Sequence, residues 1–530
     1  MRQDLIKISL LFWMSLGLFT VGLSQQEIIG FDSRFYLFAI EMGRNGLSLF
    51  PTTYGQPYPD YPVLSTLLIH GFALLGGLNK FTATLPSAIA AALTVVFTYL
   101  IGALRQERLG WYAVLFLFLT VGFFKSARSI ALDMYPTLFT TLCFYMIYSA
   151  DVLNKPARVK WIYLFLVMSF AFRGPIGLII PQSVISLYYL LNKNVKQFLV
   201  TGILAALLLI LCTGILLGLA YHEGGYLFLQ DVLRMEVLGR LQQAYQPLYF
   251  YFSAGIPNYI FSYPLALLVM IGLFFSYKKQ DERAFAWQLV GWMLIIILGM
   301  SVPAEKKIRY ILAATPAFSL LSAYLFVCAR GPFFNILRRI FSIFFAILPI
   351  LLCLSIGCIS HIAQTQGLFF PISYAKVALF FIFLLTIHGV LRAIFYKNKL
   401  LCEAFILIFA VISSVIFMLM VAEPIDLSLN KTRDVVMKIE NERAKNHAAL
   451  VFFQQNPDGL PIKYMANTPS SLHPLFINNV AELSQINMPV MVVTRKEIFK
   501  TLPIAFLEKI KLISDDKMAH VPMVVFYYEK

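Results

Sequence analysis

Long apolar runs alternate with short polar stretches over residues 1–422 of this chain. A helix that crosses a membrane needs about 20 apolar residues, because each residue advances the helix by about 1.5 Å. The pattern therefore predicts a polytopic α-helical membrane protein. Its fourteen candidate spans lie near residues 5–24, 62–78, 82–104, 110–126, 130–150, 161–172, 175–192, 197–220, 250–277, 285–300, 309–328, 334–360, 373–391 and 400–422.

Cationic residues indicate how these segments are oriented, since Lys and Arg collect in cytoplasmic loops. From Arg105 onward every second loop carries a cationic cluster, so these loops share one side. Arg2 and Lys7 join that side only if one early segment does not cross. Segment 62–78 is short and contains several glycines, so we expect it to lie at the interface. About 13 spans and a cytoplasmic N-terminus follow.

Two segments need separate interpretation. Segment 161–172 is short for a span, but merging it with segment 175–192 would place every later cationic loop on the wrong side. We therefore keep two spans. Residues 5–24 resemble a signal peptide, yet they are long enough to span and no clear small-residue cleavage site follows, so we expect an uncleaved first span.

The composition changes at Glu423, after which no further span is possible. Residues 423–530 contain 13 Lys and Arg and 12 Asp and Glu, and so are nearly neutral. Their pattern predicts a C-terminal soluble α/β domain in the periplasm, following a transmembrane domain at residues 1–422. We expect strands near 448–453, 489–494 and 521–528, and helices near 431–445 and 501–513.

The composition supports a membrane protein. Of 530 residues, 59% are hydrophobic and 13% are charged, whereas soluble chains are about half apolar and a quarter charged. One large water-soluble enzyme is therefore excluded, and an aromatic content of 15% excludes disorder. On a soluble protein the net charge of +16 would suggest a nucleic-acid partner. Here +15 of this charge precedes residue 423, where it indicates the orientation of the spans in the membrane. We expect no nucleic-acid partner.

Familiar cofactor motifs are absent from the sequence, which has no P-loop, no GxGxxG before a helix and no HExxH. The six cysteines lie in apolar runs without a CxxC pair, which predicts buried thiols. The seven histidines are scattered, so we claim no metal site. No cofactor is certain, and a divalent metal is an option that the sequence does not support. The predicted inside loops are too short for a nucleotide-binding domain.

Ionisable residues gather in the predicted external loops, residues 25–61, 125–133, 221–247 and 301–308, and at the turn after residue 172. A leaving phosphate needs Arg or Lys, and a nucleophile needs a carboxylate to activate or orient it. An ionisable group at a membrane boundary is costly unless it is partnered or functional. The candidate residues are Asp32, Arg34, Asp60, Tyr61, Arg128, Asp133, Arg173, Arg240, Lys306, Lys307, Arg309 and Tyr310.

Structural roles could explain each of these residues alone. Asp32 could pair with Arg34 or cap a surface helix, and Asp133 could cap the helix that begins after it. The cations of residues 301–310 could anchor lipid headgroups, and the arginines of 221–247 could lie on a solvated helix face. The tyrosines could belong to an interfacial aromatic belt. Their joint position on one side favours a functional site.

These loops resemble, in order, those of the membrane-embedded GT-C glycosyltransferases that use polyprenyl-phosphate sugars. The likeness is to bacterial lipid A aminoarabinose transferases and the protein-mannosyltransferase family, and it covers roughly residues 5–330. The segments that carry it are Asp32-Ser33-Arg34-Phe35, Tyr54-Gly55-Gln56, Tyr58-Pro59-Asp60-Tyr61-Pro62, Arg128–Pro136, Phe172–Gly177, Met235–Arg240, Gln246–Tyr251 and Ser301–Pro316.

The resemblance implies roles for the candidates. Asp32 would be the principal catalytic carboxylate, acting as base toward an acceptor hydroxyl or orienting an acceptor phosphate, and Asp133 would support it. The donor phosphate would be held by Arg173, Arg240, Lys306 or Lys307 and Tyr310. Acceptor or loop positioning would fall to Arg34, Asp60, Tyr61, Arg128 and Arg309.

Three positions depart from the family pattern. Ser33 replaces a frequent acidic residue, and Tyr61 stands where aminoarabinose transferases have Lys. Val237 stands where some relatives have a metal-linked His, so we claim no structural metal site. These departures argue against copying the aminoarabinose assignment.

The sequence therefore predicts an inverting glycosyltransferase of the bacterial inner membrane, surrounded by membrane lipids. It would move a sugar from undecaprenyl phosphate to lipid A, another envelope glycan or a protein on the periplasmic face. The alternatives are a transporter or flippase of lipid-linked sugars, and a membrane assembly protein. Transporters typically show internal repeats and ionisable residues at mid-membrane. This chain shows no clear repeat and its charges lie in loops, which favours the enzyme.

Overall fold

The structure is a computed structural model that describes residues 2–238, 246–275, 280–365, 374–395, 399–429, 432–468, 472–518 and 521–529. Contacts divide the chain into two compact units. The helical unit comprises residues 1–21, 59–65 and 84–424, and the α/β unit comprises residues 22–58, 66–83 and 425–530. The first long loop and the C-terminal segment thus belong to the same unit.

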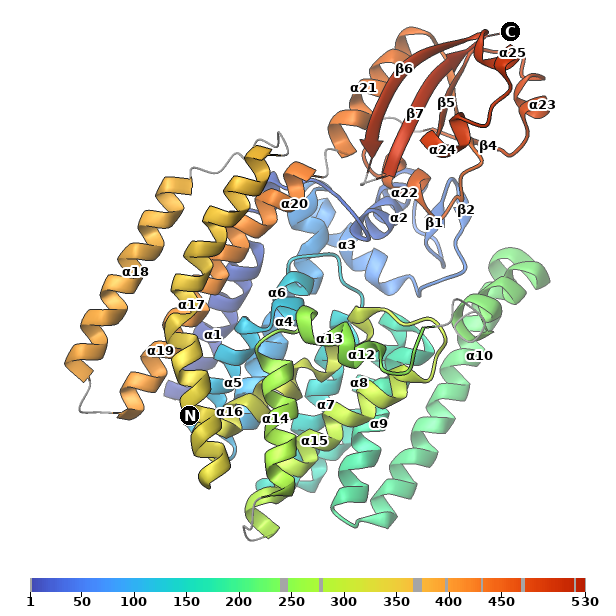
Figure 1. Cartoon of the computed structure of the whole chain (residues 1–530). Helices are drawn as coiled ribbons and strands as arrows, with labels where there is room; N and C mark the ends of the chain where they lie inside the picture. Colours follow the sequence, from blue (N-terminus) through green and yellow to red (C-terminus); the bar gives the residue numbers. More distant parts are fainter. Residues whose placement is uncertain are drawn as a thin grey trace. The chain divides into compact units, whose positions relative to one another are not determined.

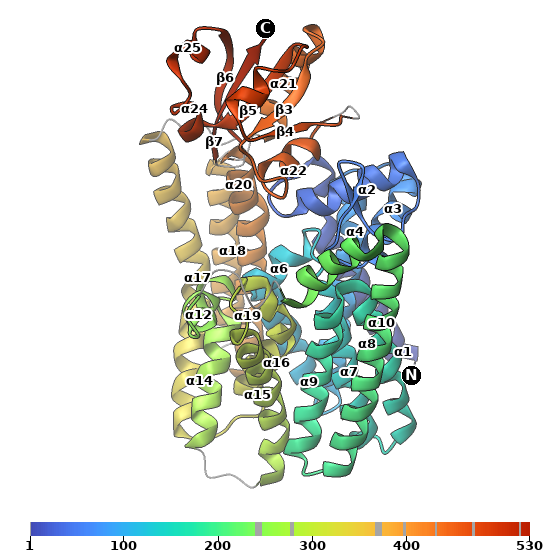
Figure 2. The same cartoon turned by 90° about the vertical axis from the view of Figure 1, so that its right-hand side faces the viewer.

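The helical unit consists of α-helices that run side by side (Figures 1 and 2). A helix continues wherever an apolar run lacks a turn, and polar or glycine-containing stretches end it. Its helices are α1 (Arg2–Thr20), α4 (Lys80–Ala103), α5 (Glu107–Leu119), α6 (Val121–Ala127), α7 (Met134–Val152), α8 (Trp161–Arg173), α9 (Pro175–Leu191), α10 (Val195–Leu233), α12 (Phe250–Ser253), α13 (Gly255–Asn258), α14 (Ser262–Phe274), α15 (Gln280–Ser301), α16 (Thr315–Val327), α17 (Pro332–Thr365), α18 (Tyr374–Phe395) and α19 (Lys399–Phe417), with helical turns at Pro156–Lys160, Arg234–Leu238, Ile308–Ala314 and Met418–Ala422.

Burial distinguishes central helices from peripheral ones. The most apolar window of Ile308–Val327 is 89% buried, whereas that of Val195–Glu236 is 11% buried. The latter presents exposed side chains such as Ile203, Ile210 and Leu211, which are 61%, 70% and 59% exposed. A contiguous apolar surface of this kind is typical of contact with lipid.

Six helices of the described residues are long and apolar enough to cross a membrane, or seven if α5 and α6 form one span. The chain is therefore a multi-pass membrane protein, and the number of about 13 spans stays a prediction. Helix α3 (Leu64–Gly76), which corresponds to segment 62–78, has 13 residues. At about 1.5 Å per residue it is about 20 Å long, which is too short for a hydrocarbon core of about 30 Å.

Two expected spans are interrupted. Segment 110–126 forms α5 and α6, which meet at an angle of 77°, because Thr120 between them has an extended backbone with ψ 97°. Segment 250–277 begins with the short helices α12 and α13, and only α14 is a longer apolar helix. Phe261, which precedes α14, has a positive φ of 76° that ends the preceding turn.

The α/β unit contains a five-stranded sheet with the order β4-β3-β5-β7-β6, drawn in red in Figure 1. Strand β3 is parallel to β4 and β5, whereas β7 is antiparallel to β5 and β6. The strands are β3 (Ala449–Phe453), β4 (Leu475–Ile477), β5 (Val490–Arg495), β6 (Ile510–Met518) and β7 (Val521–Tyr528), and the helices include α2 (Asp32–Asn45), α21 (Thr432–Lys445), α22 (Leu460–Met465), α23 (Val480–Leu483), α24 (Lys496–Phe499) and α25 (Ile504–Leu507).

The first loop contributes to the core of this unit. Ile28 and Leu37 are buried in the same apolar cluster as Val436, Phe452 and Met491. The two-stranded hairpin of β1 (Thr52–Thr53) and β2 (Gln56–Pro57) follows α2. The residues around α2 thus fold together with the C-terminal segment.

The expected strands at 448–453, 489–494 and 521–528 and the expected helix at 431–445 are confirmed by β3, β5, β7 and α21. The expected helix at 501–513 is wrong. The structure has only the four-residue α25 there, followed by β6. Strand β6 pairs with β7 from Ile510 opposite Tyr528 to Met518 opposite Val521, so cross-strand pairing overrides local helix propensity.

Candidate active site

Asp133 lies directly before α7 and pairs with two arginines. Arg173 Nε is 3.1 Å from its Oδ1, and Arg309 Nε is 3.0 Å from its Oδ2. Its side chain makes no capping hydrogen bond to the helix, so the capping explanation does not describe it. One carboxylate thus holds two guanidinium groups in place, and these three charges sum to +1.

Arg173 is the last residue of α8, at a sharp break before α9. Gly174 has φ 67° and ψ −156°, a backbone conformation that favours glycine. Behind the break, Ser169 Oγ donates to the carbonyl of Gly177 over 2.5 Å. This close approach of α8 and α9 fixes the position from which Arg173 reaches Asp133.

Arg173 is 2% exposed, and its guanidinium lies 5.0 Å from the centre of the Tyr61 ring. Such a cation–π contact is worth about 2 kcal/mol when desolvated. Within the described part of the chain, Arg173 Nη1 is buried and has no hydrogen-bond partner. A buried donor without a partner costs about 1–3 kcal/mol, so this nitrogen is suited to a ligand oxygen.

Glu236 fixes Tyr61 from another segment. The backbone N–H of Tyr61 donates to Glu236 Oε1 over 3.1 Å, and Tyr61 has the unusual positive φ of 76°. A Cβ added at Gly174 would lie 3.0 Å from Glu236 Oε2. Beside them, Asp60 Oδ1 is buried and has no hydrogen-bond partner among the described residues. We call Asp60, Tyr61, Asp133, Arg173, Glu236 and Arg309 the Asp133 cluster.

The two neighbouring lysines have different surroundings. Lys306 is 4% exposed, and its Nζ donates to the carbonyls of Gln246 and Pro303 over 2.8 and 2.9 Å. It therefore holds two loops together. Lys307 pairs with Glu305 over 2.6 Å and is 40% exposed, so it is the more accessible of the two.

Tyr310 and Arg128 complete the candidates of the helical unit. The ring of Tyr310 lies 5.7 Å from the Arg309 guanidinium. Arg128 is bound to both oxygens of Glu423, with its Nε at 2.5 Å and its Nη2 at 2.8 Å. It also donates to the carbonyls of Leu18 and Val21. These contacts fit loop positioning by Arg128 at the end of α1.

Asp32 belongs to the α/β unit, where it forms a buried ion pair with Lys80. The side chains of Lys80 and Asp32 are 5% and 10% exposed. Arg34 donates to the carbonyl of Asp458 over 3.0 Å, and its guanidinium lies 5.4 Å from the ring of Tyr58.

The segment after α2 is shaped by Glu41, which is 6% exposed. Its carboxylate accepts the backbone N–H groups of Tyr54 and Gly55 over 2.5 and 3.1 Å. Burial raises the pKa of the Tyr54 phenol, which stays protonated and donates to the carbonyl of Pro457 over 2.7 Å. These bonds fix the hairpin that follows Asp32 in the chain.

Arg240 lies outside the described residues. Among the residues that the structure does describe, no group of three or more His, Cys, Asp or Glu could hold a metal ion. Sequence reasoning missed Lys80 and gave Glu236 no role. Lys80 is a lone cation at the edge of an apolar run, and such a residue is costly unless it has a partner. That signal could have identified it.

The sequence matches the model of the Alg9-like mannosyltransferase family over residues 61–331, which is about half of the chain. The chain belongs to the Alg9-like mannosyltransferase family. An uncharacterized protein of Aquifex aeolicus (strain VF5) is 25% identical over 331 residues, covering 61% of this chain and 73% of that protein. Membership in this family supports glycosyl transfer as the activity of the chain.

Solved structures show the same fold. The crystal structure of ArnT from Cupriavidus metallidurans in the apo state matches with a TM-score of 0.72 and 15% identity, covering 99% of this chain and 98% of that one. The same protein bound to undecaprenyl phosphate gives 0.71 and 14%, covering 98% and 97%. Family and fold together confirm the resemblance to GT-C glycosyltransferases.

Proposed function

We propose that this family member transfers a sugar from undecaprenyl phosphate to lipid A, another envelope glycan or a protein. The transfer would take place at the periplasmic face of the bacterial inner membrane and invert the anomeric centre. The N-terminus would be cytoplasmic and residues 423–530 periplasmic, as the cationic loops indicate. The observation that carries the proposal is the buried side chain of Arg173. Its Nε pairs with Asp133, and its Nη1 has no hydrogen-bond partner among the described residues.

The chemistry follows from these groups. As the glycosidic bond to the carrier breaks, negative charge develops on the departing phosphate. Guanidinium groups that are already oriented stabilise this charge without reorganising. Asp133 pairs with Arg173 through Oδ1 and with Arg309 through Oδ2. We assign the donor phosphate to these two arginines, with Lys307 and Arg240 as further cationic contacts and Tyr310 as a hydroxyl donor.

An acceptor hydroxyl requires a carboxylate base. Asp32, which is paired with Lys80, would accept the proton of an acceptor hydroxyl, or would orient an acceptor that is already a phosphate. Asp60 would accept a hydrogen bond from a sugar hydroxyl through Oδ1, which has no partner among the described residues. Lys306 and Arg128 would hold the surrounding loops through their carbonyl contacts.

The ArnT of Cupriavidus metallidurans supports the choice of carrier, because one of its crystal structures holds undecaprenyl phosphate. A flippase of lipid-linked sugars would share the spans and a lipid groove. It would not need a carboxylate base, so the two functions differ in how they respond to Asp32→Asn. A flippase would keep its activity, whereas a transferase would lose catalysis.

The direct test uses the full chain in lipid nanodiscs. Native mass spectrometry measures undecaprenyl phosphate bound to the wild type, Asp133→Asn, Arg173→Met and a control, Arg234→Gln. Arg234 is a predicted external cation whose side chain is 66% exposed. We expect the first two variants to lose the lipid and the control to keep it. Equal retention by all four proteins would refute the assignment of the phosphate site.

A further inference from the structure

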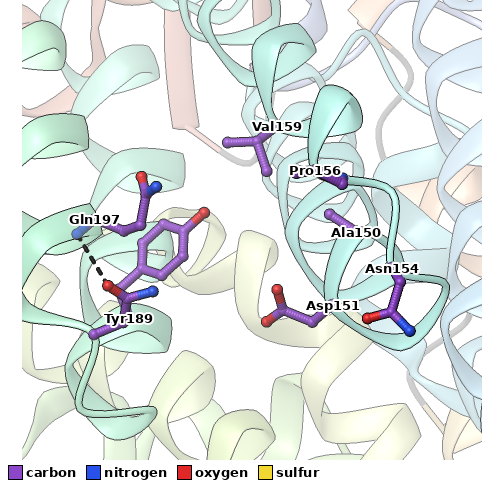
Figure 3. Close-up of a pocket in the computed structure, with 8 residues that line it drawn as sticks. Ala150, Asp151, Asn154, Pro156, Val159, Tyr189 and Gln197 are labelled. Atoms are coloured by element: carbon purple, nitrogen blue, oxygen red, sulfur yellow. Dashed lines mark hydrogen bonds between the residues drawn. The ribbon is translucent and has the colours of Figure 1, made fainter.

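A second polar site lies at the opposite end of the helices that hold the Asp133 cluster. Helix α7 begins after Asp133 and has 19 residues, so at about 1.5 Å per residue it extends about 28 Å. Near its far end is a cavity of about 410 Å³ (Figure 3). The lining residues are Ala150, Asp151, Asn154, Pro156, Val159, Tyr189, Asn194 and Gln197, and we call it the Asp151 pocket.

The interior of the Asp151 pocket is suited to a cation. Helices α7 and α9 both end at it, and helix C-termini carry partial negative charge. Helix α10 begins at it, with Asn194 as the N-cap, so the carboxylate of Asp151 is the decisive charge. Asp151 adds a full negative charge, and Tyr188 donates a hydrogen bond of 2.6 Å to its Oδ2. Figure 3 shows Asp151 and the ring of Tyr189 on opposing walls. Amide oxygens of the lining Asn and Gln residues can accept further N–H groups.

The turns at the two helix ends are preorganised in the same way. Asn154 and Lys193 have positive φ angles of 53° and 57°. The N–H of Lys155 bonds to the carbonyl of Ala150, and that of Asn194 to the carbonyl of Tyr189, each over 2.9 Å. These bonds are typical of the Schellman motif, so the pocket walls do not have to order when a ligand binds.

The rim has the opposite charge. The two loops that line the pocket also carry Lys155, Arg158, Lys160, Lys193 and Lys196. Their flanks expose apolar side chains, with Leu153 41% and Leu190 51% exposed. A ligand that fits all three features has a cationic tip, an adjacent anion and apolar tails.

We propose that the Asp151 pocket binds the headgroup of an aminophospholipid. The primary ammonium would lie against Asp151, the phosphodiester against the loop lysines, and the acyl chains along the exposed apolar side chains. The cavity volume lies within the usual range of about 300–1,000 Å³ for ligand pockets. A purely anionic headgroup would offer no group that pairs with the carboxylate of Asp151, whose negative charge disfavours it.

A quaternary ammonium is disfavoured for another reason. It has no N–H group, so it cannot satisfy Asp151 and the amide oxygens as a primary ammonium does. The proposal does not rest on glycosyl transfer, because no residue of the Asp133 cluster lines this pocket. In the topology proposed above, the bound lipid would belong to the cytoplasmic leaflet.

The test measures lipids retained by the purified full chain in native mass spectrometry. The protein is equilibrated with equal amounts of phosphatidylethanolamine, phosphatidylcholine and phosphatidylglycerol. We expect at least tenfold preferential retention of phosphatidylethanolamine by the wild type. Equal retention of the three lipids, or a preference for either of the others, would overturn the proposal whether or not any variant folds.

Variants then locate the site. Asp151→Asn should abolish the preference, whereas Tyr188→Phe, which keeps the carboxylate, should retain it. The matched control is Asp231→Asn, an acid on α10 whose side chain is 49% exposed. A preference that survives in Asp151→Asn would overturn the assignment to this pocket. Soluble phosphoethanolamine at equal concentration should not displace the lipid. Displacement would show that the ligand is a free headgroup and would contradict the lipid proposal.

Discussion

Replacement of Arg173 by Lys tests the geometry of the Asp133 cluster while keeping its charge. Lysine cannot reproduce the Nε contact of 3.1 Å to Asp133 together with the stacking at 5.0 Å on Tyr61. A hydrogen bond to a charged group contributes about 1.5–3 kcal/mol, and a desolvated cation–π contact about 2 kcal/mol. Allowing for a partial replacement by the ammonium, we expect a loss of about 3 kcal/mol in transition-state stabilisation, or about 100-fold in rate.

The assay is the initial rate of undecaprenyl phosphate release from a lipid-linked sugar donor, measured with purified protein. Arg234→Lys is the control, and its rate should stay within about threefold of the wild type. A double-mutant cycle with Asp133→Asn should show that the two losses are not additive, because each variant breaks the same contact. A rate for Arg173→Lys within threefold of the wild type would refute the phosphate-binding role.

Three other substitutions test separate parts of the structure. Tyr464→Phe removes the 2.6 Å hydrogen bond to the buried Glu440 and should lower the free energy of unfolding of the α/β unit by about 1–3 kcal/mol. Amide hydrogen exchange in β3 measures this loss, and an unchanged exchange rate would contradict it. Gly174→Ala introduces a Cβ 3.0 Å from Glu236 at a φ of 67°, and it should abolish sugar transfer while the protein still folds. An active variant would show that the backbone conformation between α8 and α9 need not be fixed for transfer. Partial burial raises the pKa of Glu27, so the stability of the protein should fall as the pH rises from the unfolded-state pKa of about 4.3 through the folded-state pKa. The thermal midpoint of Glu27→Gln should fall less across that pH window than the midpoint of the wild type. An equal fall in both proteins would contradict the burial effect.

The helical architecture could be predicted because each apolar run is a local property of the sequence. Each of the fourteen candidate segments overlaps at least one helix of the described residues. What the pattern could not show was tertiary geometry, such as the 77° bend at Thr120. It also could not show that β6 pairs with β7 in place of a helix at 501–513, because strand pairing depends on residues distant in the sequence.

The sequence predicted which residue types form the candidate site, but it predicted only part of which residues pair with one another. The sequence placed Asp133, Arg173 and Arg309 in separate loops, and the structure joins them at one carboxylate. It gave no sign of the buried ion pair that Asp32 forms with Lys80. Partner choice depends on helix packing and loop closure, which one sequence without spatial information does not determine.

The central claim is sugar transfer from a lipid carrier to an envelope acceptor. The measurement that tests it most directly is mass spectrometry of lipid A, envelope glycans and glycoproteins from cells with and without the gene, complemented by the wild type or by Asp32→Asn. We predict that one sugar modification disappears with the gene, returns with the wild type and does not return with Asp32→Asn. Full restoration of that modification by Asp32→Asn, or an unchanged set of modifications in cells without the gene, would contradict the account.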